Sequence, residues 1–78
     1  MYEELADFLE DRIRAGDLPP GGRLPGEQAM RQEYNVALST VRKAVGLLRN
    51  RGLVVTRASK GSFVVRDLPP QENARGSR

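Results

Sequence analysis

Hydrophobic residues recur at helical spacing at the start of the chain. The positions that share one side of a helix over residues 2–15 are Tyr2, Leu5, Ala6, Leu9 and Ile13. We expect the acids between them to face water, Glu10 and Arg14 to pair one turn apart, and Gly16 to end the helix.

A second helical stripe lies within residues 37–52. We expect the other helices and strands to be organised around this segment. Its apolar positions, spaced i, i+3, i+4 and i+7, are Val41, Ala44, Val45 and Leu48. The opposite face is polar and basic, with Ser39, Arg42, Lys43, Gly46 and Asn50. The major groove of DNA admits such a helix, although an ordinary surface helix with a solvated charged face has the same pattern.

Between these helices the sequence predicts a connector and a short helix. Residues 17–25 hold prolines and glycines that exclude helix, with room for a very short strand at Arg23 and Leu24. A short helix follows over 26–34, then Asn35 as a left-handed stop and Val36 as an apolar anchor. A short helix, a tight turn of about four residues and a longer basic helix make a helix-turn-helix.

After Gly52 the hydrophobic period changes from helical to alternating. Residues 53–56 and 62–65 are rich in β-branched and aromatic side chains, and residues 57–61 between them form a basic, glycine-containing loop. This pattern predicts a β-hairpin wing. Such a hairpin can simply close the core, but a basic tip also suits a contact with a minor groove or a phosphate.

The predicted fold is therefore α+β, mainly α: a winged helix-turn-helix of three helices plus a C-terminal β-hairpin wing. It occupies residues 1–66. Residues 67–78 are polar, contain Pro and Gly, and are predicted to form a linker or a disordered tail.

The amino-acid composition limits the kinds of functional site that we expect. The 78 residues include no Cys and no His, so the commonest metal ligands and the commonest general base are missing. We expect no enzyme, no cofactor and no metal site. No apolar run is long enough for a membrane span, and acids stand where a signal peptide needs basic residues. We expect a soluble intracellular domain.

The charges are segregated along the chain. The first eleven residues hold five acids, whereas the segment from Ser39 to Arg66 holds seven Lys or Arg and no acid. Such an asymmetry favours a polyanionic partner, most commonly nucleic acid. An anionic membrane surface is the alternative, but the basic segment lacks the large apolar face of an interfacial helix.

Several separated motifs, in this order, resemble the N-terminal winged helix-turn-helix domain of the GntR family of bacterial transcription regulators over about residues 2–66. They are Tyr2 and Ile13, Leu18-Pro19-Pro20-Gly21, Arg23-Leu24-Pro25, Glu27, Thr40-Val41-Arg42, Gly52-Leu53-Val54 and Gly61-Ser62-Phe63-Val64. The resemblance implies that the third helix and the wing contact double-stranded DNA, and that a homodimer binds a near-palindromic operator. By position it carries DNA contacts to Ser39, Thr40, Arg42, Lys60 and Gly61.

The sequence departs from the family pattern at several positions. Where the family commonly has Ser-Arg, this chain has Ala37-Leu38; Ser39 is then expected to cap a shortened helix, and Leu38 to meet a thymine methyl. Gly26, Gln28 and Arg31 also differ from the usual residues. The full set of candidate DNA-binding residues is Gln28, Arg31, Leu38, Ser39, Thr40, Arg42, Lys43, Arg49, Arg57, Ser59, Lys60 and Gly61.

The expected function is sequence-specific binding of double-stranded DNA for transcriptional regulation, as a repressor in the bacterial cytoplasm. The alternatives are a winged helix that binds proteins, which needs an apolar patch on the third helix, and a nonspecific or RNA-binding module, which needs exposed aromatics. The effector-binding C-terminal domain of the family is expected to be absent from this chain, which is then either an excised domain or a naturally short regulator.

Overall fold

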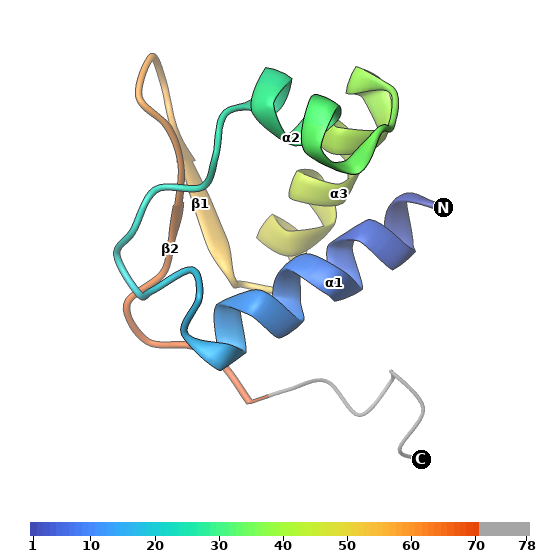
Figure 1. Ribbon diagram of the computed structural model, residues 1–78. Helices are drawn as coiled ribbons and strands as arrows, with labels where there is room; N and C mark the ends of the chain where they lie inside the picture. Colours follow the sequence, from blue (N-terminus) through green and yellow to red (C-terminus); the bar gives the residue numbers. More distant parts are fainter. Residues whose placement is uncertain (71–78) are drawn as a thin grey trace.

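The computed structural model describes residues 1–70 and contains the predicted elements in the predicted order. They are α1 (Tyr2–Ala15), α2 (Glu27–Tyr34), α3 (Leu38–Asn50), β1 (Val54–Arg57) and β2 (Gly61–Val64). The three helices lie together, and the β1–β2 hairpin stands beside them with its tip at the same end of the molecule as α2 (Figure 1). The winged helix-turn-helix expected from the sequence is confirmed.

The ends of α1 and α2 lie where the local sequence favours them, but the beginning of α3 does not. α1 ends at Gly16, whose left-handed φ of 91° lets its N–H bond the carbonyls of Arg12 and Ile13. α2 ends at Asn35, also left-handed with φ 54°. α3 begins at Leu38 after Ala37, which makes no side-chain cap. The prediction that Ser39 caps a shortened helix is therefore wrong, because Ser39 already lies in the first turn of α3.

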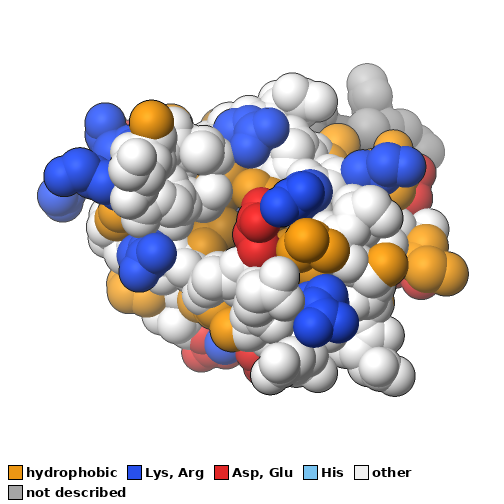
Figure 2. Space-filling model, turned by 90° about the horizontal axis from the view of Figure 1, so that it is seen from above, with side chains coloured by type: hydrophobic (Ala, Val, Ile, Leu, Met, Phe, Trp, Pro, Cys, Tyr) orange, Lys and Arg blue, Asp and Glu red, His pale blue; other side chains and the backbone are white. Residues whose placement is uncertain are grey.

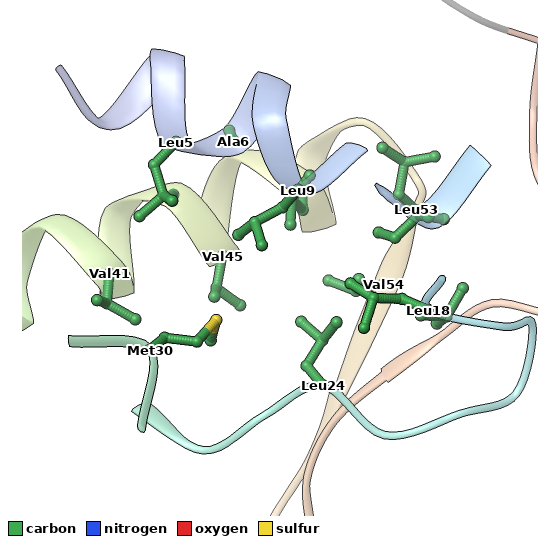
Figure 3. Close-up of a cluster of buried hydrophobic side chains, with 14 residues drawn as sticks. Leu5, Ala6, Leu9, Leu18, Leu24, Met30, Val41, Val45, Leu53 and Val54 are labelled. Atoms are coloured by element: carbon green, nitrogen blue, oxygen red, sulfur yellow. The ribbon is translucent and has the colours of Figure 1, made fainter. Parts of the chain in front are cut away.

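The apolar stripes predicted for α1 and α3 meet in a single core. Figure 3 shows side chains of α1 directed toward those of α3, with Met30 of α2, Leu24 of the connector and Val54 of β1 closing the space beside them. The buried members are Leu5, Ala6, Leu9, Ile13, Leu18, Leu24, Met30, Val41, Ala44, Val45, Leu48, Leu53, Val54 and Val64. Val36, the predicted anchor in the turn, packs against this core from its edge.

The wing is an antiparallel hairpin extended by the connector. β1 pairs with β2 in a register that sets Val54 opposite Val64 and Arg57 opposite Gly61. On its other edge β2 receives the connector, since the Gly21 N–H donates to the Val64 carbonyl at 2.9 Å. The short strand expected at residues 23–24 is reduced to an isolated bridge between Arg23 and Phe63. The connector therefore fixes the base of the wing to the helical core.

Most of the predicted linker at 67–78 lies outside the described residues. Within its described part, the side chain of Leu68 packs against the core. The boundary between domain and linker stays a prediction.

One acid of α1 contradicts the expectation that its acids face water. Glu10 pairs with Arg14 at 2.9 Å as expected, but it is only 1% exposed and also accepts a hydrogen bond from Arg51 Nη1 at 2.8 Å. Arg51 follows α3 and contacts Asp7 as well, at 2.9 Å. A buried carboxylate is tolerated here because two guanidinium groups compensate its charge. This cluster ties α1 to the end of α3.

We expect replacement of Glu10 to destabilise the fold. Glu10→Ala leaves Arg51, whose side chain is 16% exposed, and Arg14 without their shared partner. Losing one member of a buried ion pair costs about 3–5 kcal/mol, which urea unfolding measures as a lower free energy of unfolding. The control is Glu4→Ala, an exposed acid of the same helix, for which we expect a loss below about 1 kcal/mol. Equal effects of the two substitutions would contradict a structural role for the buried cluster.

The loop of the wing depends on a glycine. Gly61 has φ +107°, and a Cβ there would lie 2.9 Å from Nε of Arg23. Gly61→Ala should therefore lower the free energy of unfolding by about 1–3 kcal/mol and lower Tm. Gly46→Ala is the matched control, because Gly46 lies within α3 and its Cβ would meet only Arg49 Nη2 at 3.6 Å. Gly46→Ala should raise stability by about 0.5–1 kcal/mol, and an unchanged Tm for Gly61→Ala would contradict the strain argument.

Candidate nucleic-acid interface

Burial of the α3 stripe directs the polar side of the helix away from the core. Ser39 and Arg42 are exposed, and Leu38 and Thr40 are half-buried at the beginning of the helix. The Arg42 side chain is 61% exposed. Ser39 and Arg42 are three positions apart, so this end of α3 presents a hydroxyl group and a guanidinium on one open face.

Arg42 is held by a carboxylate from the neighbouring helix. Its Nε lies 3.2 Å from each of the two carboxylate oxygens of Glu27, and its Nη2 lies 3.2 Å from Oε1. Glu27 is the first residue of α2 and is 51% exposed. An ion pair this open to water contributes little to stability, roughly 0.2–1 kcal/mol, so its main effect is on the position of the arginine.

Arg49, one of the predicted DNA-binding residues, is bonded to the wing instead of lying free. Its Nη1 donates to the Thr56 hydroxyl of β1 at 3.0 Å, and that hydroxyl lies 2.9 Å from the Ser62 hydroxyl of β2. Residues 56 and 62 are cross-strand partners. The last turn of α3 is thus linked through two hydroxyls to both strands of the hairpin.

These two contacts surround a hollow between α2, α3 and the wing. The hollow measures about 260 Å³, and its lining residues are Glu27, Arg42, Val45, Arg49, Thr56 and Ser62. Figure 2 views the molecule from the end that holds α2 and the tip of the wing, and Lys and Arg side chains are spread over this face with few acids among them. The face is basic and indented, which suits the backbone of a nucleic acid.

Lys43 and the two polar residues of α2 lie apart from this hollow. The Lys43 ammonium is 5.9 Å from the centre of the Tyr2 ring, on the side of α3 that faces the start of α1. On α2, Arg31 donates from Nε to the Gln28 side-chain oxygen at 3.0 Å, and both residues are exposed. Each of these side chains is accessible, but α3 does not bring them beside Arg42.

The tip of the wing carries the remaining candidates. Ser59 has a left-handed φ of 66°, and the Lys60 N–H donates to the Arg57 carbonyl at 3.0 Å to close the loop. Ser59, Lys60 and Gly61 line one side of a hollow of about 510 Å³, and the beginning of α2 lines the other. Arg57 instead borders the opposite face of the hairpin, beside Val55 and Phe63. The structure therefore separates Arg57 from Lys60, which the sequence had grouped together.

Sequence reasoning missed three residues of this surface. Glu27 and Ser62 were named only as marks of the family resemblance, and Thr56 entered only as a residue of the first predicted strand. Glu27 and Arg42 are separated by fifteen positions, and no helical or strand period predicts such a contact. The alternation of the hairpin does predict that Thr56 faces the same side as the buried Val54, and hence toward α3.

Two further results concern other classes of function. Within residues 1–70 no group of acidic residues is arranged to hold a metal ion. None of the helices in that part of the chain combines the length and the apolar character needed to cross a membrane.

Comparison with known proteins gives consistent matches. Residues 1–64 match the model of the bacterial regulatory proteins of the gntR family. The Exu regulon transcriptional regulator of Escherichia coli K12 is 35% identical over 74 residues, which are 95% of this chain and 29% of that protein. The HTH-type transcriptional repressor NagR of Bacillus subtilis is 31% identical over 74 residues, again 95% of this chain and 30% of the repressor.

Solved structures agree with the sequence matches. The DNA-binding domain of AraR in complex with its operator ORR3 superimposes with a TM-score of 0.78 and 30% identity, over 82% of this chain and 77% of that one. The matched segment thus spans about three-tenths of the length of these two curated relatives and most of an isolated DNA-binding domain. Because the family model matches residues 1–64, which hold the three helices and the wing, this chain belongs to the GntR family of bacterial regulatory proteins.

Proposed function

We propose that this chain binds double-stranded DNA in a sequence-specific manner and thereby regulates transcription, as a repressor. The observation that carries the proposal is the outward face of α3, where Arg42 is exposed while the apolar stripe of the same helix is buried. A helix exposed in this way enters the major groove with its N-terminal residues against base edges. The 30% identical AraR domain, which is bound to operator DNA, supports the same use of this fold.

In this function seven of the twelve candidate residues form two groups. Leu38, Ser39, Thr40 and Arg42 lie in the first turns of α3 and face base edges. Lys43 and Arg49, farther along α3, and Lys60 on the wing neutralise phosphates. Lys60 projects from the tip of the hairpin, where a minor groove or the backbone beside the major groove is within reach.

The complete binding unit is proposed to be a homodimer on a near-palindromic operator in the bacterial nucleoid. One α3 reads a single half-site, and two copies related by a two-fold axis read half-sites one helical turn or more apart. In the Exu regulon regulator and NagR the matched segment is about three-tenths of the protein, so the proposal assigns effector binding and stable dimerisation to regions of such regulators outside that segment.

A protein-binding winged helix is the alternative from another class, and the exposed side chains disfavour it. Among the described residues, the exposed large hydrophobic side chains are Met1, Phe8 and Val55, and none of them lies on α3. RNA recognition by base stacking is disfavoured for a related reason, since α3 and the tip of the wing carry no aromatic residue. A regulator of this kind needs no catalytic group.

The function is tested by selection. The chain is incubated with a pool of randomised duplexes, and the bound fraction is amplified and sequenced over several rounds. Sequence-specific binding predicts enrichment of one half-site motif, whereas recovery of a random population would contradict the proposal.

Lys60→Ala should weaken binding to every sequence about equally. Each phosphate contact contributes a slope of about −0.9 in the dependence of log K on log salt concentration, so losing one contact should make the slope shallower by about one. Fluorescence anisotropy at several salt concentrations measures both quantities. Arg66→Ala is the control, because it removes the same charge beyond the base of the hairpin. An unchanged slope for Lys60→Ala would argue against a wing that faces DNA.

Arg42→Ala should remove discrimination at one or two base pairs of the selected motif. A bidentate pairing of the guanidinium with O6 and N7 of guanine is worth about 1–3 kcal/mol, or roughly 5- to 150-fold in the ratio of specific to mismatched affinity. Arg42→Lys is the matched variant, since it keeps the charge but loses the planar fork, and it should also lose discrimination while binding unrelated DNA normally. If specific and nonspecific affinities instead fall by the same factor, Arg42 contacts a phosphate.

A further inference from the structure

The contact between Glu27 and Arg42 uses one particular side of the guanidinium. Glu27 accepts from Nε at 3.2 Å and lies 3.2 Å from Nη2, and these two nitrogens form one side of the guanidinium. A guanidinium has five N–H donors in a fixed plane. The carboxylate therefore occupies the side edge of the plane and leaves the terminal edge, formed by Nη1 and Nη2, available to another acceptor pair.

We propose that Glu27 is a specificity-determining residue that positions Arg42 for base recognition. By holding the side edge, Glu27 aims the terminal edge outward from α3, in the arrangement that pairs end-on with O6 and N7 of guanine. The inference rests on the proposed DNA-binding function and adds a second residue, from α2, to the reading of one base pair.

Two features of the structure support a positioning role. Both residues stand on helices that pack against the same core, Glu27 at the first position of α2 and Arg42 at the second turn of α3, so the two backbones are fixed relative to each other. A long arginine side chain loses rotamer freedom when it binds a base. Because Glu27 restricts that freedom before DNA arrives, part of this entropic cost is already met in the free protein.

The charges distinguish Arg42 from its basic neighbours. Arg49 is held by the neutral Thr56 hydroxyl, and Lys43 lies over the neutral Tyr2 ring, so both keep their full positive charge for phosphates. Arg42 alone among these three faces a carboxylate at 3.2 Å. A residue that served only to grip phosphate would be weakened by such a neighbour, since an anion beside it repels the DNA backbone. If Arg42 reads a base, the repulsion between Glu27 and the DNA backbone is useful. It disfavours binding of Arg42 to a phosphate instead of to the base.

Glu27→Gln tests this role, because it keeps the size of the side chain and removes its charge. The substitution frees Arg42 to bind phosphate, so affinity for unrelated DNA should rise and the salt slope should steepen by about one. Discrimination between the selected duplex and the same duplex with the recognised guanine replaced should fall about tenfold, within the range that one bidentate pairing provides. Circular dichroism at increasing temperature confirms that the variant is folded.

The matched control is Glu33→Gln, the same charge change on α2 at a residue that lies 3.9 Å from Arg12 of α1. It should leave discrimination unchanged. A double-mutant cycle completes the design: in an Arg42→Ala background, Glu27→Gln should no longer alter discrimination.

Three results would overturn the inference. If Glu27→Gln and Glu33→Gln behave alike, Glu27 contributes only to the overall charge. If Glu27→Gln alters the preference at another base pair and preserves the recognised guanine, Glu27 reads a base directly. If the unaltered chain enriches no motif at all, the proposed function itself fails and the role of Glu27 fails with it, which the selection experiment shows before any variant is made.

Discussion

The burial of one stripe of α3 is the constraint on which the rest of this structure depends. Val41, Val45 and Leu48 lie on that stripe, and burial of each side chain contributes roughly 1.5–3 kcal/mol relative to exposure. Rotating the helix about its axis would expose them, so the orientation of α3 is fixed by the hydrophobic effect. Arg42, one residue after Val41, is turned outward for the same reason. The surface that contacts DNA in our proposal is thus a consequence of how the core is filled.

Three polar contacts join α3 to α1, α2 and β1. One of them is buried and two are exposed, and this difference gives them different roles. Arg51, just after the helix, meets the buried Glu10 of α1, and loss of Glu10 would leave Arg51 with only the more exposed Asp7 as a partner. At the exposed face, Arg42 meets Glu27 of α2 and Arg49 meets Thr56 of β1, where water competes for every donor. The buried contact stabilises the fold. The exposed contacts orient side chains and leave them available to a ligand.

The sequence predicted the helices and strands well because each is marked by a local pattern, either a hydrophobic period or a residue that ends a helix. The apolar stripes of α1 and α3, the left-handed stop at Asn35 and the alternation after Gly52 are local signals, and the structure confirms them. Contacts between residues of different helices and strands leave no such local pattern in the sequence. Glu10 resembles any solvated acid until Arg51, forty-one positions later, is brought beside it. The N-terminus of α3 was misplaced for a related reason, since Ala37 supplies no capping side chain and packing, not a cap, decides where the helix begins.

In the wing, successive side chains of each strand point to opposite faces of the hairpin, and this places the candidate residues on two different faces. Thr56 and Ser62 face α3 and bond Arg49, so the odd-numbered neighbours Val55, Arg57 and Phe63 border the opposite side of the hairpin. Grouping Arg57 with Lys60 by sequence alone ignored this alternation. Because Arg49 links the last turn of α3 to both strands, the hairpin cannot swing independently of the helix without breaking that contact. The separation between the N-terminal end of α3 and the tip at Lys60 is therefore constrained in the free protein. In our proposal, a duplex must match that separation to contact both.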